Sequence, residues 1–226
     1  MNARIARIEA FELRLPLPRP LRLGEMLIPY REYSMVRVYD QDGRFGSAYA
    51  LSRNAPIAQV VQQTITPFWE TQPLEAHQTF YTHTVRANVC LGTNGIFWRA
   101  LSLADCALFD LLAQRAEQPL AVYLGGTPRR IDTALVGGYP SPDESAASLA
   151  DWAQVTAARQ PAVIKIASTS DYAQDTQRLR AIRRAIPDGP PLAIDLYWRA
   201  PDAATLLRDA SAWSELGMAW IEDPFP

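Results

Sequence analysis

The feature that most constrains the fold is a regular alternation of short apolar runs and helical segments after Gly125 and Gly126. The apolar runs are continuous and recur at intervals of about 27 to 30 residues, which fits β/α units. Continuous apolar strands are typical of parallel sheets, because both of their faces are covered. The sequence therefore predicts a parallel α/β domain. In chain order, we expect strand 133–137, helix 142–159, strand 162–166, helix 171–185, strand 192–194, helix 201–216 and strand 218–221.

The segment before Gly126 has the pattern of an antiparallel sheet followed by helices. Residues 5–13 alternate like a strand, and residues 35–39 and 45–50 flank a turn signal, which predicts a hairpin. Apolar residues recur at three- and four-residue steps further on. From that recurrence we expect helices over 56–68, 73–87 and 97–116.

The stretch between the first strand and the hairpin is rich in proline. It begins at Pro16, Pro18 and Pro20 and continues to Pro29, which predicts a loop. We interpret the whole chain as an α+β domain over 1–126 and a parallel (β/α) domain over 127–226. A complete barrel needs eight strands and roughly 250 residues, so the second domain holds only strands 1–4 of one.

Composition excludes several classes of protein. The formal net charge is −2 with 20% charged residues, so no basic field is present to hold nucleic acid or an anionic membrane. Cys90 and Cys106 fit neither a disulfide framework nor a metal cluster, and Cys106 is predicted to be a small core residue. The first residues lack a signal-peptide pattern, and no run approaches the roughly 18 apolar residues of a membrane span. We therefore expect a cytoplasmic protein.

Two carboxylates end successive predicted strands. Asp195 and Glu222 are about 27 residues apart, and in a parallel sheet the carboxyl ends of the strands carry the ligand site. The pair could share a hard cation such as Mg²⁺, which takes oxygen ligands. The alternative is that each acid caps a helix or pairs with a surface arginine.

Lys165 lies within an apolar strand, where a charged residue is rare unless it projects into a polar centre. Near a cation its pKa would fall, which suits a proton carrier. The alternative is a lysine at a strand end whose ammonium reaches solvent.

One passage resembles a known family. Residues 104–114 and 119–126 are similar to a helix and a Pro-Leu…Leu-Gly-Gly passage of the enolase superfamily, in its mandelate racemase and muconate lactonizing enzyme branch. The resemblance implies a capping domain over an enolase-like TIM barrel. It also implies Mg²⁺-dependent removal of the proton alpha to a carboxylate, in an acid-sugar (aldonate) dehydratase or a racemase.

By position, the resemblance implies that Asp195 and Glu222 are metal ligands and that Lys165 is the first lysine of the family's Lys-x-Lys motif. Loops near 19–26 and 50–55 would close over the substrate. The predicted substrate-binding residues are Tyr197, Arg22 and Tyr49.

Three departures from the family pattern bear on activity. Ala167 stands where the second lysine, usually the base, is expected, so either Lys165 or a group from a later segment must take the proton. The third metal ligand would lie beyond Pro226, and Tyr197 replaces an asparagine common in relatives.

The departures leave alternatives open. The chain is a fragment of a longer enzyme, a chain that completes its sheet as a homo-oligomer, or an inactive remnant. The alternative function is a non-catalytic protein that uses the same scaffold for assembly or for binding an organic acid.

Overall fold

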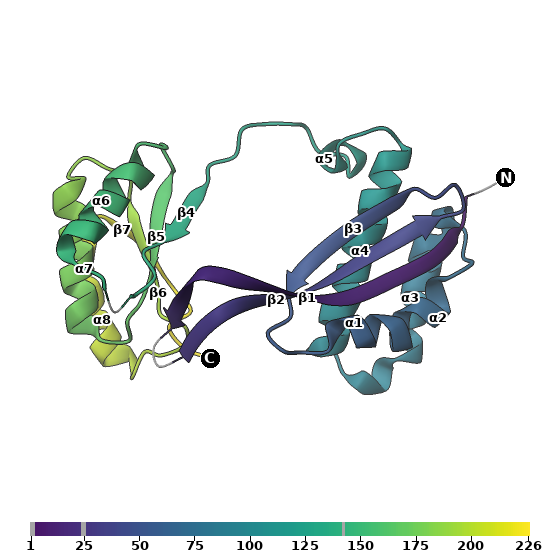
Figure 1. The fold of residues 1–226 in the computed structure, drawn as a ribbon, viewed down its shortest axis with the longest axis horizontal. Helices are drawn as coiled ribbons and strands as arrows, with labels where there is room; N and C mark the ends of the chain where they lie inside the picture. Colours follow the sequence, from purple (N-terminus) through teal and green to yellow (C-terminus); the bar gives the residue numbers. More distant parts are fainter. Residues whose placement is uncertain (1–2, 24–25, 142) are drawn as a thin grey trace. The chain divides into compact units, whose positions relative to one another are not determined.

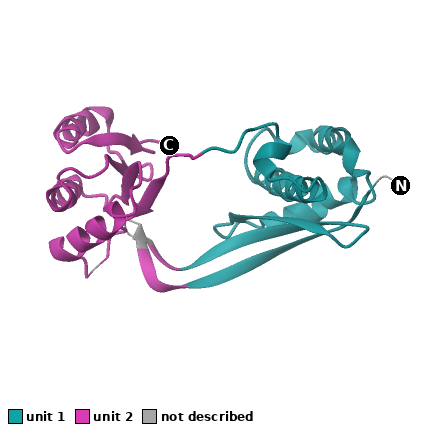
Figure 2. Ribbon diagram, turned by 90° about the horizontal axis from the view of Figure 1, so that it is seen from above, with its two compact units in different colours: residues 1–16, 30–129 teal, residues 17–29, 130–226 magenta. Residues whose placement is uncertain are grey.

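The computed structural model describes residues 3–23, 26–141 and 143–226. It contains two compact units: residues 1–16 and 30–129 form unit 1, and residues 17–29 and 130–226 form unit 2 (Figure 2). Two long strands, β1 (Ile5–Leu23) and β2 (Met26–Asp40), contribute residues to both units.

Unit 1 contains a three-stranded sheet in the order β1-β2-β3, where β3 is Phe45–Leu51. Strands β2 and β3 are antiparallel, with Val36 opposite Ala48, so the predicted hairpin is confirmed. Its turn is held by Asp40, whose Oδ1 accepts hydrogen bonds from the backbone N–H groups of Asp42 and Arg44. Gly43 in this turn has a φ of 82°, a value that glycine adopts without strain.

The prediction of a loop over Pro16–Pro29 is wrong for the described residues, because β1 runs to Leu23 and β2 starts at Met26. β1 is an edge strand of its sheet. Pro16, Pro18 and Pro20 are two residues apart, so the sides that lack an N–H group all face the same way. An edge strand has one unpaired side, and that side accommodates proline.

Helices cover one face of this sheet (Figure 1). The predicted helix over 56–68 contains one π-helical turn, and the other two predicted helices are confirmed with small shifts at their ends. The helical segments of unit 1 are α1 (Ile57–Val60), π-helical η1 (Val61–Ile65), α2 (Thr66–Trp69), 3-10 η2 (Leu74–Ala76), α3 (His77–Ala87), 3-10 η3 (Val89–Leu91), α4 (Ile96–Arg115) and α5 (Leu120–Tyr123).

Helix α4 forms the centre of the unit 1 core. Its buried face includes Ala104, Leu108 and Leu111, none of which is exposed. β3 approaches α4 so closely that a Cβ on Gly46 would lie 2.1 Å from the backbone oxygen of Ala107. Cys106, predicted to be a core residue, is exposed. Two residues turn a helix by about 200°, so Cys106 faces away from the side that buries Ala104.

Unit 2 is a four-stranded parallel sheet in chain order, with a helix after each of the first three strands. Its strands are β4 (Ala134–Gly137), β5 (Val163–Ala167), β6 (Leu192–Asp195) and β7 (Met218–Glu222). Its helices are α6 (Ala146–Ala157), α7 (Tyr172–Ala185) and α8 (Ala203–Ser214). The predicted architecture, an α+β segment followed by the first four parallel strands of a partial barrel with helices between them, is confirmed.

The three helices of unit 2 pack on one face of its sheet (Figure 1). Side chains of α6, α7 and α8 share a buried cluster with Ile164 and Ile166 of β5 and Ile194 of β6. Because strand residues alternate between faces, Lys165 and Asp195 lie on the opposite face, which we call the inner face. Among the described residues, no helix is both long and apolar enough to span a membrane.

Candidate active site

Register places the predicted site residues at neighbouring positions on the inner face. Lys165 is the register partner of Ala193, and Ala167 is the partner of Asp195. Asp195 is in turn the partner of Glu222. The carboxyl ends of β5, β6 and β7 therefore bring the lysine and both acids together.

A register shift between β6 and β7 is needed for this arrangement. Leu192 pairs with Met218, but Ala193 pairs with Trp220, so Ala219 is an extra residue on β7. One extra residue exchanges the two faces of a strand beyond it. The shift therefore puts Glu222 on the face of Asp195, while Ile221 packs against the helix-side core.

The three side chains are in direct contact. Lys165 Nζ donates a hydrogen bond to Glu222 Oε1 at 2.5 Å and lies 3.4 Å from Asp195 Oδ2. The side chains of Lys165 and Asp195 are 12% and 11% exposed, and that of Glu222 is 35% exposed. The lysine is thus a mostly buried cation between two carboxylates.

Contact with the acids changes the proton affinities. Burial is the largest influence on Lys165 and lowers its pKa, but the hydrogen bond with Glu222 and the charge of Asp195 together raise the pKa above its ordinary value. The hydrogen bond from Lys165 lowers the pKa of Glu222, and burial only partly opposes it. Both shifts favour the charged forms, so Lys165 and Glu222 form an ion pair at neutral pH.

The chain beyond each acid is held in a tight backbone arrangement. The backbone N–H of Leu196 donates a hydrogen bond to the backbone carbonyl oxygen of Glu222. The backbone N–H of Trp198 donates one to the backbone carbonyl oxygen of Asp223. Tyr197 N–H donates to Asp195 Oδ1 at 3.1 Å. Tyr197, Trp198 and Asp223 have φ values of 51°, 59° and 45°, a region that costs energy for residues with bulky side chains.

Asp223 was not among the metal ligands predicted from the sequence. Asp195, Glu222 and Asp223 each offer a carboxylate oxygen, and these oxygens lie within 4.8 Å of one another. The signal was present as the second acid of the Glu-Asp pair that ends β7. Three hard oxygen donors fit a cation such as Mg²⁺, which also keeps several waters.

A second missed feature is a buried polar network around Arg178 on α7. Arg178 Nη1 donates to the Ala167 oxygen at the end of β5, and Nη2 donates to the Gly138 oxygen just after β4. Glu144 accepts two further bonds from the same guanidinium. Asp175, which is fully buried, accepts from Ser168 Oγ just past the strand end. The network fixes the ends of two strands beside Lys165.

The predicted substrate-binding residues have different placements. Tyr197 lies two residues after Asp195, next to the site. The side chain of Arg22 lies outside the described residues. Tyr49 belongs to unit 1, where it is 71% exposed and its ring contacts Tyr33 edge-on. The roles of all three stay predictions.

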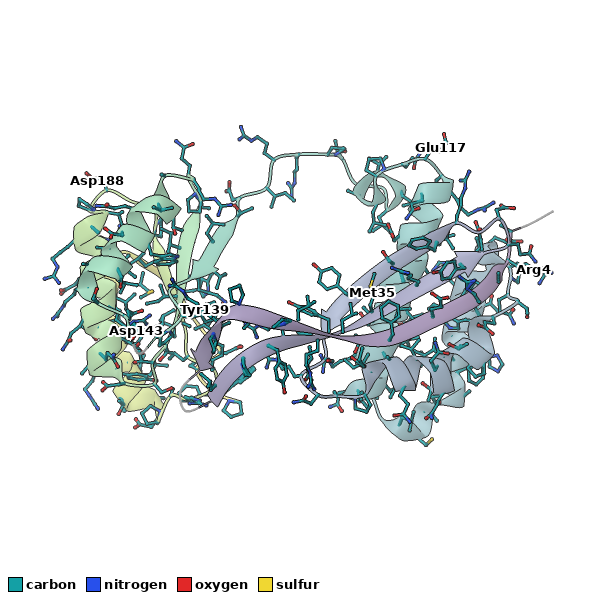
Figure 3. The ribbon with its side chains drawn as sticks, in the orientation of Figure 1. Arg4, Met35, Glu117, Tyr139, Asp143 and Asp188 are labelled. Carbon is teal, nitrogen blue, oxygen red and sulfur yellow. The ribbon has the colours of Figure 1, made fainter. Side chains whose placement is uncertain are left out.

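A cavity of about 690 Å³ also lies in unit 2. Its lining includes Arg19 from β1 and the loop after β4, where Tyr139 and Asp143 are labelled in Figure 3. Glu144, the ion-pair partner of Arg178, lines it too. The lining does not include Lys165 or the two acids, so the cavity and the cluster are separate features.

Comparisons with known proteins agree with this architecture. Residues 148–226 match a family model described as enolase C-terminal domain-like. The chain is 29% identical over 151 residues to an L-talarate/galactarate dehydratase from Salmonella typhimurium, covering 64% of this chain and 36% of that protein. It is 34% identical over 130 residues to an L-Ala-D/L-Glu epimerase from Escherichia coli, covering 56% and 37%.

The fold is shared with solved structures. An enolase from Bradyrhizobium complexed with magnesium and mandelic acid superposes with a TM-score of 0.86 at 24% identity, covering 100% of this chain and 62% of that one. The chain thus matches less than two thirds of its relatives' length. The matched model, the sequence relatives and the shared fold agree with the resemblance noted from the sequence. By these matches the chain is similar to the enolase superfamily, in the mandelate racemase/muconate lactonizing enzyme-like family, and it spans only part of its full-length relatives.

Proposed function

We propose that this chain carries part of the active site of a Mg²⁺-dependent enzyme that removes the proton alpha to a carboxylate. The observation that carries the proposal is the convergence of Lys165, Asp195 and Glu222 at the carboxyl ends of three successive parallel strands. Distant relatives include acid-sugar dehydratases and epimerases. The proposed substrate is accordingly a small hydroxy acid such as an aldonate.

The residues present fit the implied metal. Asp195 and Glu222 would hold it, and the oxygen of Asp223 lies within reach of both. A bound divalent cation would supply positive charge opposite the substrate oxygen on which negative charge develops. Low exposure of Lys165 and Asp195 would strengthen this electrostatic effect, because less water screens it.

Lys165 is proposed as the group that holds or moves a proton at its Nζ. Its ammonium already lies against both acids, so a substrate carboxylate placed there would find a charged donor. Ala167, two residues on, is 1% exposed and has no titratable group. The end of β5 therefore supplies one proton-transfer group.

Dehydration and racemisation differ in the proton-transfer groups that they need. Racemisation removes a proton from one face of a planar intermediate and returns one to the other, so it needs a second group on the opposite side. Loss of water needs one group to remove the proton and one to assist the departing hydroxyl, and a single residue can serve both steps. Acid-sugar dehydratases are among the matched relatives, so a dehydratase is the first candidate, and a racemase is the second.

The test is Mg²⁺ binding followed by turnover. Calorimetry on the wild-type chain and on Asp195→Asn should show a Mg²⁺ site that the substitution abolishes. Incubation with a panel of aldonic and hydroxy acids should then yield a 2-keto-3-deoxy acid only with Mg²⁺ and only when Lys165 is intact, with Lys165→Met as the comparison. Absence of both metal binding and turnover contradicts the proposal.

One observation favours the second candidate function, assembly or organic-acid binding without catalysis. Val136 and Trp220, on the inner face of the sheet, are 52% and 39% exposed. Exposed apolar side chains on a sheet face are a place for self-association. Light scattering that shows an oligomer, together with carboxylate binding but no turnover, would favour this candidate.

A further inference from the structure

The two oxygens of Glu222 are held by different donors. Lys165 Nζ bonds Oε1, and the indole Nε1 of Trp220 donates a hydrogen bond to Oε2 at 3.2 Å. Trp220 and Glu222 are two residues apart on β7, so they share the inner face. The register shift at Ala219 places both side chains there together.

Glu222 needs such support more than Asp195 does. Asp195 is short, 11% exposed at its side chain, and held by the Tyr197 N–H. Glu222 has one more rotatable bond and is 35% exposed, so more rotamers are open to it. A bound cation would compete with Lys165 for the same carboxylates, so the lysine would not hold Glu222 once the cation is bound. The indole is rigid, neutral and anchored in the strand.

We propose that Trp220 is a positioning residue for Glu222. The indole N–H of Trp220 donates a hydrogen bond to Glu222 Oε2. This bond orients the carboxylate so that Oε1 points toward Asp195, where it can bind a divalent cation. The inference rests on the proposed metal site and adds a residue to it that touches neither metal nor substrate. Groups that orient metal ligands in this way typically contribute about 10- to 100-fold to metal affinity.

The first experiment is a calorimetric Mg²⁺ titration of the wild type, Trp220→Phe and Trp198→Phe. Phenylalanine keeps an aromatic ring and removes the N–H. Trp198 is the matched control, because it is 46% exposed, lies beside the same site and has no described hydrogen bond to a carboxylate. The expected result is a rise in Kd of about 10- to 100-fold for Trp220→Phe and less than about 3-fold for Trp198→Phe. Equal affinities for wild type and Trp220→Phe, or equal losses in both variants, would overturn the proposal.

A second measurement tests the hydrogen bond without metal. In a ¹H–¹⁵N spectrum, the indole resonance missing from Trp220→Phe identifies Trp220. Replacing the charged acceptor by a neutral amide in Glu222→Gln should move that resonance upfield, while the other indole signals stay in place. An unmoved resonance contradicts the inference.

The two measurements separate the inference from the proposed function. If the wild type binds no Mg²⁺, the metal site of the proposed function fails, and the role of Trp220 in metal affinity fails with it, even when the resonance moves. If the wild type binds Mg²⁺ and Trp220→Phe binds it equally well, only the inference fails. Far-UV circular dichroism and thermal midpoints of all variants exclude unfolding as the cause of lost binding.

Discussion

Asp195 and Glu222 are register partners on adjacent parallel strands because β7 contains one extra residue, Ala219, opposite the step from Leu192 to Ala193. If Ala219 instead paired with Ala193 in regular register, Glu222 would be paired one position further along and would lie on the helix-covered face. In this sequence, the bulge at Ala219 therefore sets the face on which Glu222 lies.

The first prediction concerns this register. Deleting Ala219 removes the bulged residue and leaves the pairing of Trp220 with Ala193 intact, so Mg²⁺ affinity should stay within a few-fold of wild type. Inserting one alanine between Ile221 and Glu222 turns the Glu222 side chain to the other face and should abolish Mg²⁺ binding. Calorimetry on both chains measures the effect. Loss of binding in the deletion with retention in the insertion would show that the shift does not place the acid.

The second prediction concerns acid pH. The pKa of Glu222 is lowered from its ordinary value of 4.5 by the Lys165 hydrogen bond. A lowered pKa in the folded state stabilises the fold above the unfolded value, and this stabilisation is lost as the pH falls through the folded value. Between pH 7 and pH 3, the free energy of unfolding of wild type should therefore fall more than that of Glu222→Gln, as measured by urea unfolding.

For Lys165, the dependence of folding stability on pH has the opposite sign. Its pKa is raised above 10.5, so its contribution to stability is complete below that pH and is lost only as the pH rises through the higher folded value. Lys165→Met should therefore remove the extra acid sensitivity of wild type as fully as Glu222→Gln does. Wild type and both variants falling in parallel below pH 4.5 would contradict the pairing.

The third prediction concerns the buried network on α7. Arg178 is 5% exposed and bonds Glu144, the Ala167 oxygen and the Gly138 oxygen. Arg178→Met leaves these acceptors and the buried Asp175 without their cation, which should cost about 3–5 kcal/mol of unfolding free energy. Arg180→Met on the exposed side of the same helix is the control and should change stability by about 0.5 kcal/mol or less. Equal effects of the two changes, measured by urea unfolding, would show that the network is not stabilising.

The fourth prediction concerns unit 1. A Cβ at position 46 would lie 2.1 Å from the Ala107 oxygen and 2.2 Å from the Leu111 nitrogen, both backbone atoms of α4. Gly46→Ala should therefore force β3 away from α4 and destabilise unit 1 by at least about 1–3 kcal/mol. Gln41→Ala, in the exposed turn before β3, is the control and should leave the thermal midpoint nearly unchanged. A midpoint for Gly46→Ala equal to wild type would contradict the close packing.

The local pattern of the sequence was sufficient for most of the fold. The spacing of apolar runs predicted β4 to β7 and the three helices between them, because covered strands and amphipathic helices each have a fixed periodicity. Asp195, Glu222 and Lys165 could be selected because strand ends in a parallel sheet share one edge. The proline-rich segment and Cys106 were mispredicted, because edge position and helix face are properties of packing.

Tertiary structure alone decided the details of the site. The extra residue at Ala219 leaves no mark in the apolar pattern of β7, yet it determines which face carries Glu222. The hydrogen bond from Trp220 and the contacts of Arg178 join groups whose partners depend on register and on helix placement. Sequence determines which side chains reach the edge of the sheet, since that follows from local periodicity. Their mutual distances follow from strand pairing, which is a non-local interaction that no single segment encodes.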